Sequence, residues 1–427
     1  MNRVLLKNID TPNSTDIETY IKSGGYNALK KAYGMTPREV TDEVKRANLQ
    51  GRGGAWYPAG KKWEVSLASE RFPKYLIANA DEGEPGTFKD RPFLEQDPHM
   101  LIEGMAISAY AFGAEHGYIY VRGEYPDAYN VLTNAIKQAE DKNLLGKNIL
   151  GKGINFDLKV YRGAGSYVCG EASALIESLE GKRGHYRTRP PYMAVEGAFA
   201  RPTVVNNVET LVNVPHIIER GAQWFSSIGN PKCPGPKIFS LSGHVERPGL
   251  YELPTGVTLR EIIYEHGGGI KGGRELKAVI PGGLATSLLT KDNIDITMDV
   301  DALWKAGTSI GSGAVMVLDE DACIVHVAQR AARFFAHESC GKCTPCREAT
   351  KRIHEMLTRI AEGSGAESDL DKIVELCRLM HNTSLCGLGE SGGNLVASSI
   401  NLFRDEYLAH IRQKACPSGA CASLALA

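Results

Sequence analysis

The sequence predicts a fold of three parts: an α/β domain with a parallel sheet, a small β-grasp-like domain and an all-α C-terminal bundle. Strand and helix patterns alternate to about residue 220, and a Pro/Gly-rich stretch over residues 231–236 marks a boundary. From about Glu320 onward nearly every segment has helical periodicity. We therefore place the domains at residues 1–230, 237–318 and 319–427.

The α/β domain is expected to begin with a helical segment. Residues 36–39 form a capping box with Pro at the first helical position, which predicts a helix that ends at Gly51. Residues 75–80 have the pattern of a buried strand that leads into an acidic loop at 81–86, and residues 117–122 predict a second strand. Such alternation favours a parallel sheet.

The middle domain is predicted as a hairpin followed by a short helix. Residues 238–245 and 250–253 flank a turn at 246–249, and Thr258 with Glu261 forms a helix cap. This order of elements is typical of a β-grasp domain.

The last domain is predicted to contain four helices in a small bundle. Helix-breaking residues at 363–365, 382–386 and 392–393 separate the periodic segments.

Composition favours a soluble intracellular enzyme. The chain has 427 residues, is 43% hydrophobic and carries a net charge of −1, so it offers no basic surface for nucleic acid. Its start lacks the apolar core of a signal peptide, and no stretch is long enough to span a membrane. We expect a reducing cytoplasmic location for its ten cysteines, with any membrane link made through a partner.

Three thiols at C-x-x-C-x-x-C spacing predict an iron–sulfur cluster. Cys340, Cys343 and Cys346 can ligate three irons of a cubane, but Thr350 and Lys351 stand where a bacterial ferredoxin has its next Cys and Pro. The fourth ligand must come from elsewhere in the chain.

Cys386 is the better candidate for that ligand. It lies between a helix breaker and the glycines of Gly387-Leu388-Gly389, whereas Cys377 shares a helical face with Ile373 and Met380 and is expected in the core. A structural zinc is the weaker alternative, in which His337 would replace Cys386.

A glycine loop at residues 51–63 predicts a second site. It is not a dinucleotide fingerprint, because Trp56 stands where that motif needs Gly and because a helix precedes it. Its glycines allow close backbone approach to a ligand, Arg52 and Lys62 can neutralise a phosphate, and Tyr57 can stack on a flat heterocycle. A tight surface turn is the alternative interpretation.

Three further loops repeat this chemistry. The acidic loop after the first strand gathers Asn79, Asp81, Glu82 and Glu84 at a strand end, where open α/β sheets bind ligands. Residues 163–171 combine glycines with Tyr167 and Glu171, and residues 201–210 contain two adjacent amides. Each loop alone could be structural, but four of them beside a cluster motif favour a cofactor site.

The ordered segments GRGGAWYPAGKKW, NADEGEPGTFKDR, GAGSYVCGE, RPPY, PTVVNNVET and ESCGKCTPCR resemble the flavin-bearing, NADH-oxidising subunit of respiratory complex I. The diaphorase subunits of NAD-linked hydrogenases and formate dehydrogenases are similar. The resemblance covers nearly the whole chain and implies a Rossmann-like flavin domain, a ubiquitin-like domain and a C-terminal four-helix bundle with a 4Fe-4S cluster. It implies FMN, a 4Fe-4S cluster and NADH/NAD as cofactors.

The resemblance also implies roles for individual residues. The residues that match FMN ligands are Arg52, Gly53, Gly54, Lys62, Asn79, Asp81, Glu82, Tyr167, Gly170, Glu171, Asn206, Asn207 and Thr210. The residues that match the NADH side are Tyr57, Glu84, Arg189 and Tyr192, with Glu84 as the candidate catalytic residue. The residues that match the cluster ligands are Cys340, Cys343, Cys346 and Cys386.

The chain departs from the family pattern in three places. Trp56 replaces a Gly and is expected to narrow the stacking cavity, Ala172 replaces the second Glu of a C-G-E-E run, and residues 388–394 differ from the usual sequence. A carboxylate at position 172 would repel the 2′-phosphate of NADPH, so we expect weaker discrimination between NADH and NADPH here.

The resemblance implies two partners: a small thioredoxin-like 2Fe-2S subunit and a large iron–sulfur subunit, which would hold the chain at the membrane periphery. A diaphorase subunit of a hydrogenase or formate dehydrogenase is the nearer alternative, and a non-catalytic scaffold with structural zinc is an alternative of another class. Cys416 and Cys421 near the C-terminus indicate either a frayed tail, which we favour, or an extra metal site.

Overall fold

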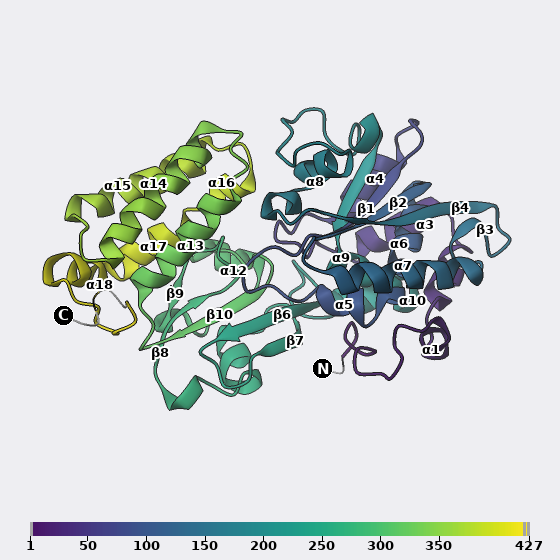
Figure 1. The fold of residues 1–427 in the computed structure, drawn as a ribbon. Coiled ribbons are helices and arrows are strands. Elements are labelled where there is room, and N and C mark those ends of the chain that lie inside the picture. The colour runs from purple at the N-terminus through teal and green to yellow at the C-terminus, as the bar shows by residue number, and fades with distance from the viewer. Residues whose placement is uncertain (1–2, 422–423, 425–427) are drawn as a thin grey trace. The chain divides into compact units, whose positions relative to one another are not determined.

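A computed structural model describes residues 3–421 and residue 424 (Figure 1). The chain divides into two compact units. The first comprises Met1–Gly83, Phe88–Ile238 and Glu252–Gly256, and the second comprises Glu84–Thr87, Phe239–Tyr251 and Val257–Ala427. Among the described residues, no helix combines the length and the apolar character needed to cross a membrane.

The first unit is built on a five-stranded sheet of order β3-β4-β2-β1-β5. Its strands are β1 (Tyr75–Ala80), β2 (His116–Val121), β3 (Gly146–Ile149), β4 (Ile154–Arg162) and β5 (Thr203–Asn207). Strands β4, β2, β1 and β5 are parallel to their neighbours, and only the edge strand β3 is antiparallel. The predicted parallel α/β sheet is confirmed.

Eleven α-helices of the described chain belong to the first unit. They are α1 (Ile17–Lys22), α2 (Asn27–Ala32), α3 (Pro37–Arg46), α4 (Ala59–Leu67), α5 (Arg91–Glu95), α6 (Pro98–Phe112), α7 (Pro126–Asp141), α8 (Ala172–Leu179), α9 (Val208–Val212), α10 (Val214–Arg220) and α11 (Ala222–Ser226). Helix α6 is buried along nearly its whole length, because it contacts β1, β2 and β4 as well as α2, α3 and α10. A helix that is apolar all round needs such a position.

Helix α3 begins where its sequence signal predicts. Thr36 and Glu39 form the reciprocal capping box. The helix ends at Arg46 and not at Gly51, because Asn48 takes a left-handed conformation with φ of 52°. The helix ends earlier than predicted because an asparagine, as well as a glycine, can adopt the left-handed conformation.

The second unit contains a five-stranded sheet of order β7-β6-β10-β8-β9. Its strands are β6 (Pro236–Gly243), β7 (Gly249–Pro254), β8 (Leu276–Ile280), β9 (Leu289–Thr290) and β10 (Ala314–Asp319). The chain passes between the two units within β6 and β7. The first strand, β6, pairs in parallel with the last, β10, at the centre of the sheet, so the predicted β-grasp arrangement is confirmed.

Thr258 and Glu261 bond reciprocally, as the sequence predicts, and start a short helical turn at Glu261–His266. Helix α12 (Val300–Lys305) lies between β9 and β10 in sequence.

The helices of the second unit are α13 (Ile324–Glu338), α14 (Thr344–Ala361), α15 (Glu367–Thr383), α16 (Gly387–Ser391), α17 (Asn394–Leu402) and α18 (Arg404–Leu408). Helices α13, α14, α15 and α17 pack together as the predicted four-helix bundle. One apolar core joins these helices to strand β8 through Ala278 and Ile280. The predicted breaks coincide with the ends of α14, α15 and α16.

A buried histidine should make the first unit sensitive to acid. His216 in α10 is 3% exposed, and neither ring nitrogen has a hydrogen-bond partner. Burial lowers the pKa of His216 to about 3, and the charges of Lys7 and Arg220 contribute to that shift. The unfolded chain binds a proton below about pH 6.5 while the folded chain does not, so stability falls as pH drops from about 6.5 toward 3.

We therefore expect His216→Leu to raise the free energy of unfolding by about 2 kcal/mol more at pH 5 than at pH 7.5. Thermal unfolding at both pH values measures the difference, and the same change at the exposed His381 is the control. An equal gain at both pH values would contradict this assignment.

Candidate functional site

The loops predicted to form a site meet at one edge of the first sheet. Asn79 near the end of β1 pairs in register with Asn207 at the end of β5. The loop that contains Tyr167 and Gly170 follows the parallel strand β4, so it leaves the sheet at the same edge. From β1 the chain adds β2 and then β4 on one side of β1, and it later returns to place β5 on the other side of β1. Strands β1 and β5 thus enclose the position where open α/β sheets bind ligands.

The glycine loop is joined to β5 and to the start of α9. Trp63 donates from Nε1 to Asn206 Oδ1 at 3.0 Å, and the Arg52 backbone N–H donates to Thr210 Oγ1 at 2.8 Å. A Cβ at Gly53 would lie 3.1 Å from the Asn207 Cβ, so the close approach of these two segments leaves little room for a side chain at residue 53.

Asn79 connects two of the other loops. Its Nδ2 donates to the Gly170 carbonyl at 2.8 Å, and its Oδ1 accepts from the Asp81 N–H at 3.1 Å. A Cβ at Gly83 would lie 3.2 Å from the Tyr167 ring, and one at Gly170 would lie 3.4 Å from the Asp81 carbonyl oxygen. Residues of all four predicted loops therefore lie together at this edge, with the acidic loop represented by its first-unit part, residues 81–83.

Glu82 points into the protein. Its carboxylate accepts from the N–H groups of Asp90 at 2.8 Å and Arg91 at 3.3 Å, where α5 begins, and from the Tyr125 hydroxyl at 3.2 Å. Burial and the charge of Asp90 raise the pKa of Glu82 to about 7. Its carboxylate thus fixes the acidic loop to α5, a role that the sequence did not indicate.

A buried ion network that no sequence motif indicates supports the site. Glu209 accepts from Lys237 Nζ at 2.8 Å and from the Ile238 N–H at 2.9 Å, and Lys89 Nζ lies 3.0 Å from its carboxylate. Lys89 also donates to Asp90 at 2.8 Å. The three side chains Glu209, Lys237 and Lys89 are at most 1% exposed.

Charge balance holds this network in its ionised form. Burial favours the neutral acid, but the ammonium groups of Lys237 and Lys89 outweigh that effect and hold the pKa of Glu209 below its usual value. Burial lowers the pKa of Lys237 to about 8, against the opposing charge of Glu209. These lysines and Glu209 stand far apart in sequence, and isolated charged residues do not predict burial.

Arg52 lies at the margin of the same network. Its side chain is fully buried, Nη2 donates to the Pro234 carbonyl at 2.6 Å, and its guanidinium lies 4.7 Å from the centre of the Trp56 ring. Burial lowers the pKa of Arg52, and the charge of Glu209 opposes that shift. Trp56 has a φ of 54°, a conformation that favours glycine, and its packing against Arg52 offsets the backbone strain.

Cationic and aromatic groups form the more open side of the site. Lys62 Nζ lies 5.9 Å from the centre of the half-exposed Tyr57 ring. Burial lowers the pKa of Lys62, and the nearby charge of Arg189 lowers it further. Arg189 Nη2 donates to Glu171 Oε1 at 2.6 Å, while Glu171 Oε2 caps the start of α8. Tyr192 is 65% exposed on the loop beyond Arg189.

Glu84 belongs to the second unit. Its Oε1 accepts from the Ala285 N–H at 3.1 Å, and a Cβ at Gly283 would lie 2.6 Å from the Glu84 side chain. The segment Glu84–Thr87 is further held by a 2.6 Å hydrogen bond between Thr87 and Ser312.

Three of the four predicted ligand thiols lie at helix starts in the second unit, and Cys340 lies between α13 and α14. Cys343 is the N-cap of α14, Cys346 lies in its first turn and Cys386 is the N-cap of α16. Burial raises the pKa of the Cys346 thiol to about 11, and the thiols of Cys343, Cys386 and Cys340 raise it further, so the four lie near one another.

Glycine and arginine shape the thiol site. A Cβ at Gly389 would lie 3.1 Å from the Cys346 Cβ, and Arg347 Nη1 donates to the Gly341 carbonyl at 2.8 Å. The positive end of α14 and the Arg347 guanidinium favour a bound group of net negative charge.

Cys377 and His337 lie outside this group of thiols. Cys377 is 4% exposed within the bundle core, and burial raises the pKa of its thiol to about 12. A Cβ at Gly393 would lie 2.8 Å from the Cys377 Cβ, so α17 begins against it. The His337 side chain is 84% exposed and contacts Glu338 at 3.1 Å.

The residues present fit the implied cofactors. A four-iron cluster needs four thiolates that ligate different irons. Cys343, Cys346 and Cys386 lie at the starts of α14 and α16, and Cys340 lies near them in the segment before α14. A flavin nucleotide needs closely approaching backbone, a cation for its phosphate and amides for its ring. The glycine loops, Lys62 and Asn79 supply these at the sheet edge.

Comparison with known families and proteins gives consistent results. Three family models match: the Nuo51 FMN-binding domain over residues 44–216, the SLBB domain over residues 237–324, and the iron–sulfur binding region of NADH-ubiquinone oxidoreductase-F over residues 326–410. The chain is 50% identical over 415 residues to the F 2 subunit of NADH-quinone oxidoreductase from Rhizobium meliloti (strain 1021), an alignment that spans 97% of this chain and 99% of the relative.

Hydrogenase subunits are also similar. The chain is 45% identical over 422 residues to NADP-reducing hydrogenase subunit HndC of Solidesulfovibrio fructosivorans, over 99% of this chain and 86% of the relative. Its structure superposes with a TM-score of 0.85 and 38% identity on a chain in the crystal structure of NAD⁺-reducing [NiFe]-hydrogenase in the H₂-reduced state, over 96% of this chain and 67% of that chain.

The chain therefore belongs to the family of NADH-quinone oxidoreductase F subunits, as the ordered motifs implied. It is an oxidoreductase component with an FMN-binding domain and a 4Fe-4S region. As a subunit it works with other subunits of a complex.

Proposed function

We propose that the chain is the electron-input subunit of a complex I-like assembly. It takes a hydride from NADH and passes single electrons to partner subunits, and ultimately to quinone. The observation that carries this proposal is the coexistence of a flavin-type sheet edge and a four-thiol site in one chain. When bound, FMN accepts the electron pair of a hydride and releases the electrons singly, and a 4Fe-4S cluster accepts one at a time.

We assign the residues of the chain to binding and orientation. Asn79 and the glycine loop would hold the flavin at the ends of β1 and β5, and Lys62 would neutralise its phosphate. Tyr57, Arg189 and Tyr192 would bind the dinucleotide from the exposed side. Cys340, Cys343, Cys346 and Cys386 would ligate the cluster. Glu84 would act on the nicotinamide side as an orienting carboxylate.

We propose a small thioredoxin-like 2Fe-2S subunit and a large iron–sulfur subunit as partners, with membrane association through them. A second candidate function is the diaphorase subunit of an NAD-linked hydrogenase, which the likeness to the NAD⁺-reducing hydrogenase favours. Identification of the subunits that co-purify with the chain separates the two functions. A quinone-reducing membrane arm supports the first, and a hydrogenase subunit supports the second.

The cluster assignment predicts different outcomes for two cysteines. Cys386→Ser should abolish the EPR signal of the four-iron cluster because it removes a ligand. Cys377→Ser should keep that signal but lower the free energy of unfolding by roughly 1–3 kcal/mol, because it buries a hydroxyl in an apolar core. EPR, iron content and thermal unfolding of both variants measure this. The reverse pattern would show that Cys377 is the ligand.

The flavin assignment predicts that Asn79→Leu releases FMN and leaves the iron content unchanged. The substitution removes the hydrogen bonds to Gly170 and Asp81 that hold two loops of the site together. Flavin absorbance and iron per chain are the measurements, and the same change at the exposed Asn134 of α7 is the control. Full flavin content in Asn79→Leu would refute the placement.

The residue at position 172 is expected to affect discrimination between NADH and NADPH. Ala172 is the first, partly exposed residue of α8, next to Glu171, which contacts Arg189. A carboxylate there would repel the 2′-phosphate of NADPH, so Ala172→Glu should raise the NADH/NADPH ratio of kcat/KM. We expect a change of about 5- to 150-fold, or roughly 1 to 3 kcal/mol, chiefly because NADPH binds more weakly.

The neutral variant Ala172→Gln is the matched control, since it has the same shape without the charge. Steady-state kinetics with both cofactors measures the ratio for each variant. A ratio that stays the same or falls with Glu, or that rises equally with Gln, would show that residue 172 does not face the 2′-position.

A further inference from the structure

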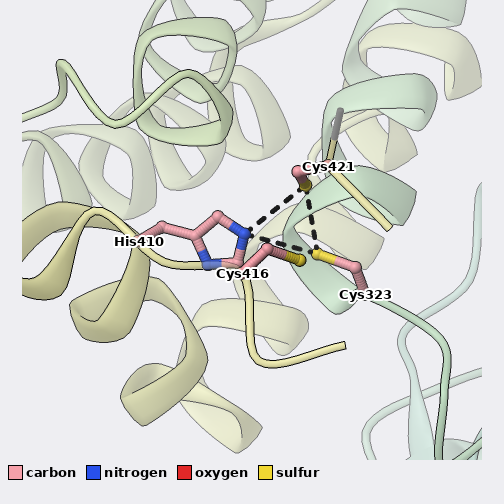
Figure 2. Close-up of side chains that lie close together, drawn as sticks. All are labelled: Cys323, His410, Cys416 and Cys421. Carbon is pink, nitrogen blue, oxygen red and sulfur yellow. Dashed lines mark hydrogen bonds between the residues drawn. The ribbon is translucent and has the colours of Figure 1, made fainter. Parts of the chain in front are cut away.

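Four side chains that take no part in the flavin or cluster sites meet in the second unit. They are Cys323, His410, Cys416 and Cys421, and their sulfur and nitrogen atoms all lie within 4.8 Å of one another (Figure 2). We propose that they bind one Zn²⁺ ion as a structural site of three cysteines and one histidine.

The distances match tetrahedral zinc. With Zn–S bonds of about 2.3 Å and a Zn–N bond of about 2.0 Å, the sulfurs of a tetrahedron lie about 3.8 Å apart and about 3.5 Å from the nitrogen. The Cys323 and Cys421 sulfurs are 3.6 Å apart, and they lie 3.6 Å and 3.5 Å from His410 Nε2. Cys416 points its sulfur at the same position (Figure 2).

The histidine is prepared for metal binding. His410 Nδ1 lies 2.8 Å from the Glu406 carbonyl oxygen, so Nδ1 carries the proton and Nε2 presents a lone pair to the three sulfurs. His410 is fully buried, and Cys323 and Cys421 are 3% and 6% exposed. Burial of cysteines against a fixed imidazole is typical of a closed structural zinc site.

Other occupants fit this geometry less well. A disulfide needs an S–S distance of about 2.05 Å, whereas the Cys323 and Cys421 sulfurs are 3.6 Å apart. A cubane holds its thiolates farther apart than these four ligand atoms, because each thiolate binds a different iron.

The site joins distant parts of the unit. Cys323 is the N-cap of α13, His410 follows α18, and Cys416 and Cys421 lie in the segment after it. Helix α13 has 15 residues and is therefore about 22 Å long, and its other end leads into Cys340. The zinc would fix the segment that follows α18 to the start of the helix that leads to the first cluster ligand.

Metal analysis of the purified protein tests the proposal. We expect about one zinc per chain beside the iron, and zinc X-ray absorption with about three sulfur neighbours and one nitrogen. Cys421→Ser and Cys416→Ser should lose the zinc, with flavin and iron contents showing that the fold survives. Cys377→Ser, a change at a buried cysteine of the same bundle, should keep it.

His410→Cys keeps the test decisive even where the removal variants fail to fold. It should retain zinc and change the neighbours from three sulfurs and one nitrogen to four sulfurs. A wild-type protein without zinc, zinc with four sulfur neighbours in the wild type, a lone iron at this site or a Cys323–Cys421 disulfide found by thiol alkylation and mass spectrometry would each overturn the proposal.

Discussion

The candidate flavin site, at the carboxyl ends of β1 and β5, depends on a carboxylate that water cannot reach. Glu209 is the second residue of α9, directly beyond β5, and it holds Lys89 beside the acidic loop, and Lys237 and the Ile238 N–H at the start of β6. Loss of that single charge would leave the buried Lys237 ammonium without its counter-ion and Lys89 with Asp90 alone. Breaking a buried ion pair destabilises a protein by about 3–5 kcal/mol. Glu209 fixes the start of α9, which contains Asn207 and Thr210. The glycine loop contacts both of these residues, so its position also depends on Glu209.

Other buried carboxylates of the first unit also accept hydrogen bonds from backbone N–H groups, as Glu209 does from Ile238. Glu252 accepts from the N–H groups of Val4, Leu5 and Leu6 at 2.8 to 3.1 Å, and Glu103 accepts from the Leu29 N–H at 3.0 Å and the Tyr20 hydroxyl at 2.7 Å. Glu82 caps α5 in the same way. In each case a carboxylate satisfies backbone donors that no strand or helix pairs, which matters because an unpaired buried N–H is costly. The loops of this unit are therefore held as much by side-chain acceptors as by apolar packing.

The sequence predicted those features that depend on local pattern. The strand at residues 75–80, the cap of α3 and the core position of Cys377 follow from periodicity and helix-start signals, and the structure agrees with each. The ordered motifs also predicted which loops would meet, since the carboxyl ends of parallel strands share an edge. The direction of a side chain was not predictable from the sequence. Glu82 and Arg52 have charged groups that could bind a cofactor, yet both side chains point into the protein. The sequence offered Cys416 and Cys421 as a possible metal site, but it did not indicate Cys323 and His410 as their partners, because Cys323 lies 98 positions before Cys421 and the four residues form no motif.

The segment Glu84–Thr87 has a consequence for the order in which the protein forms. It closely follows β1, yet it is held by Gly283, Ala285 and Ser312, which are synthesised about two hundred residues later. On the ribosome, the sheet of the first unit can therefore assemble before the turn after Glu82 has anything to bind. Contacts of such long sequence separation form late and slow the folding of a chain. The turn that contains Glu84 is therefore among the last parts of the chain to reach its final conformation, because its partners Ala285 and Ser312 do not exist until the β-grasp sheet is nearly complete.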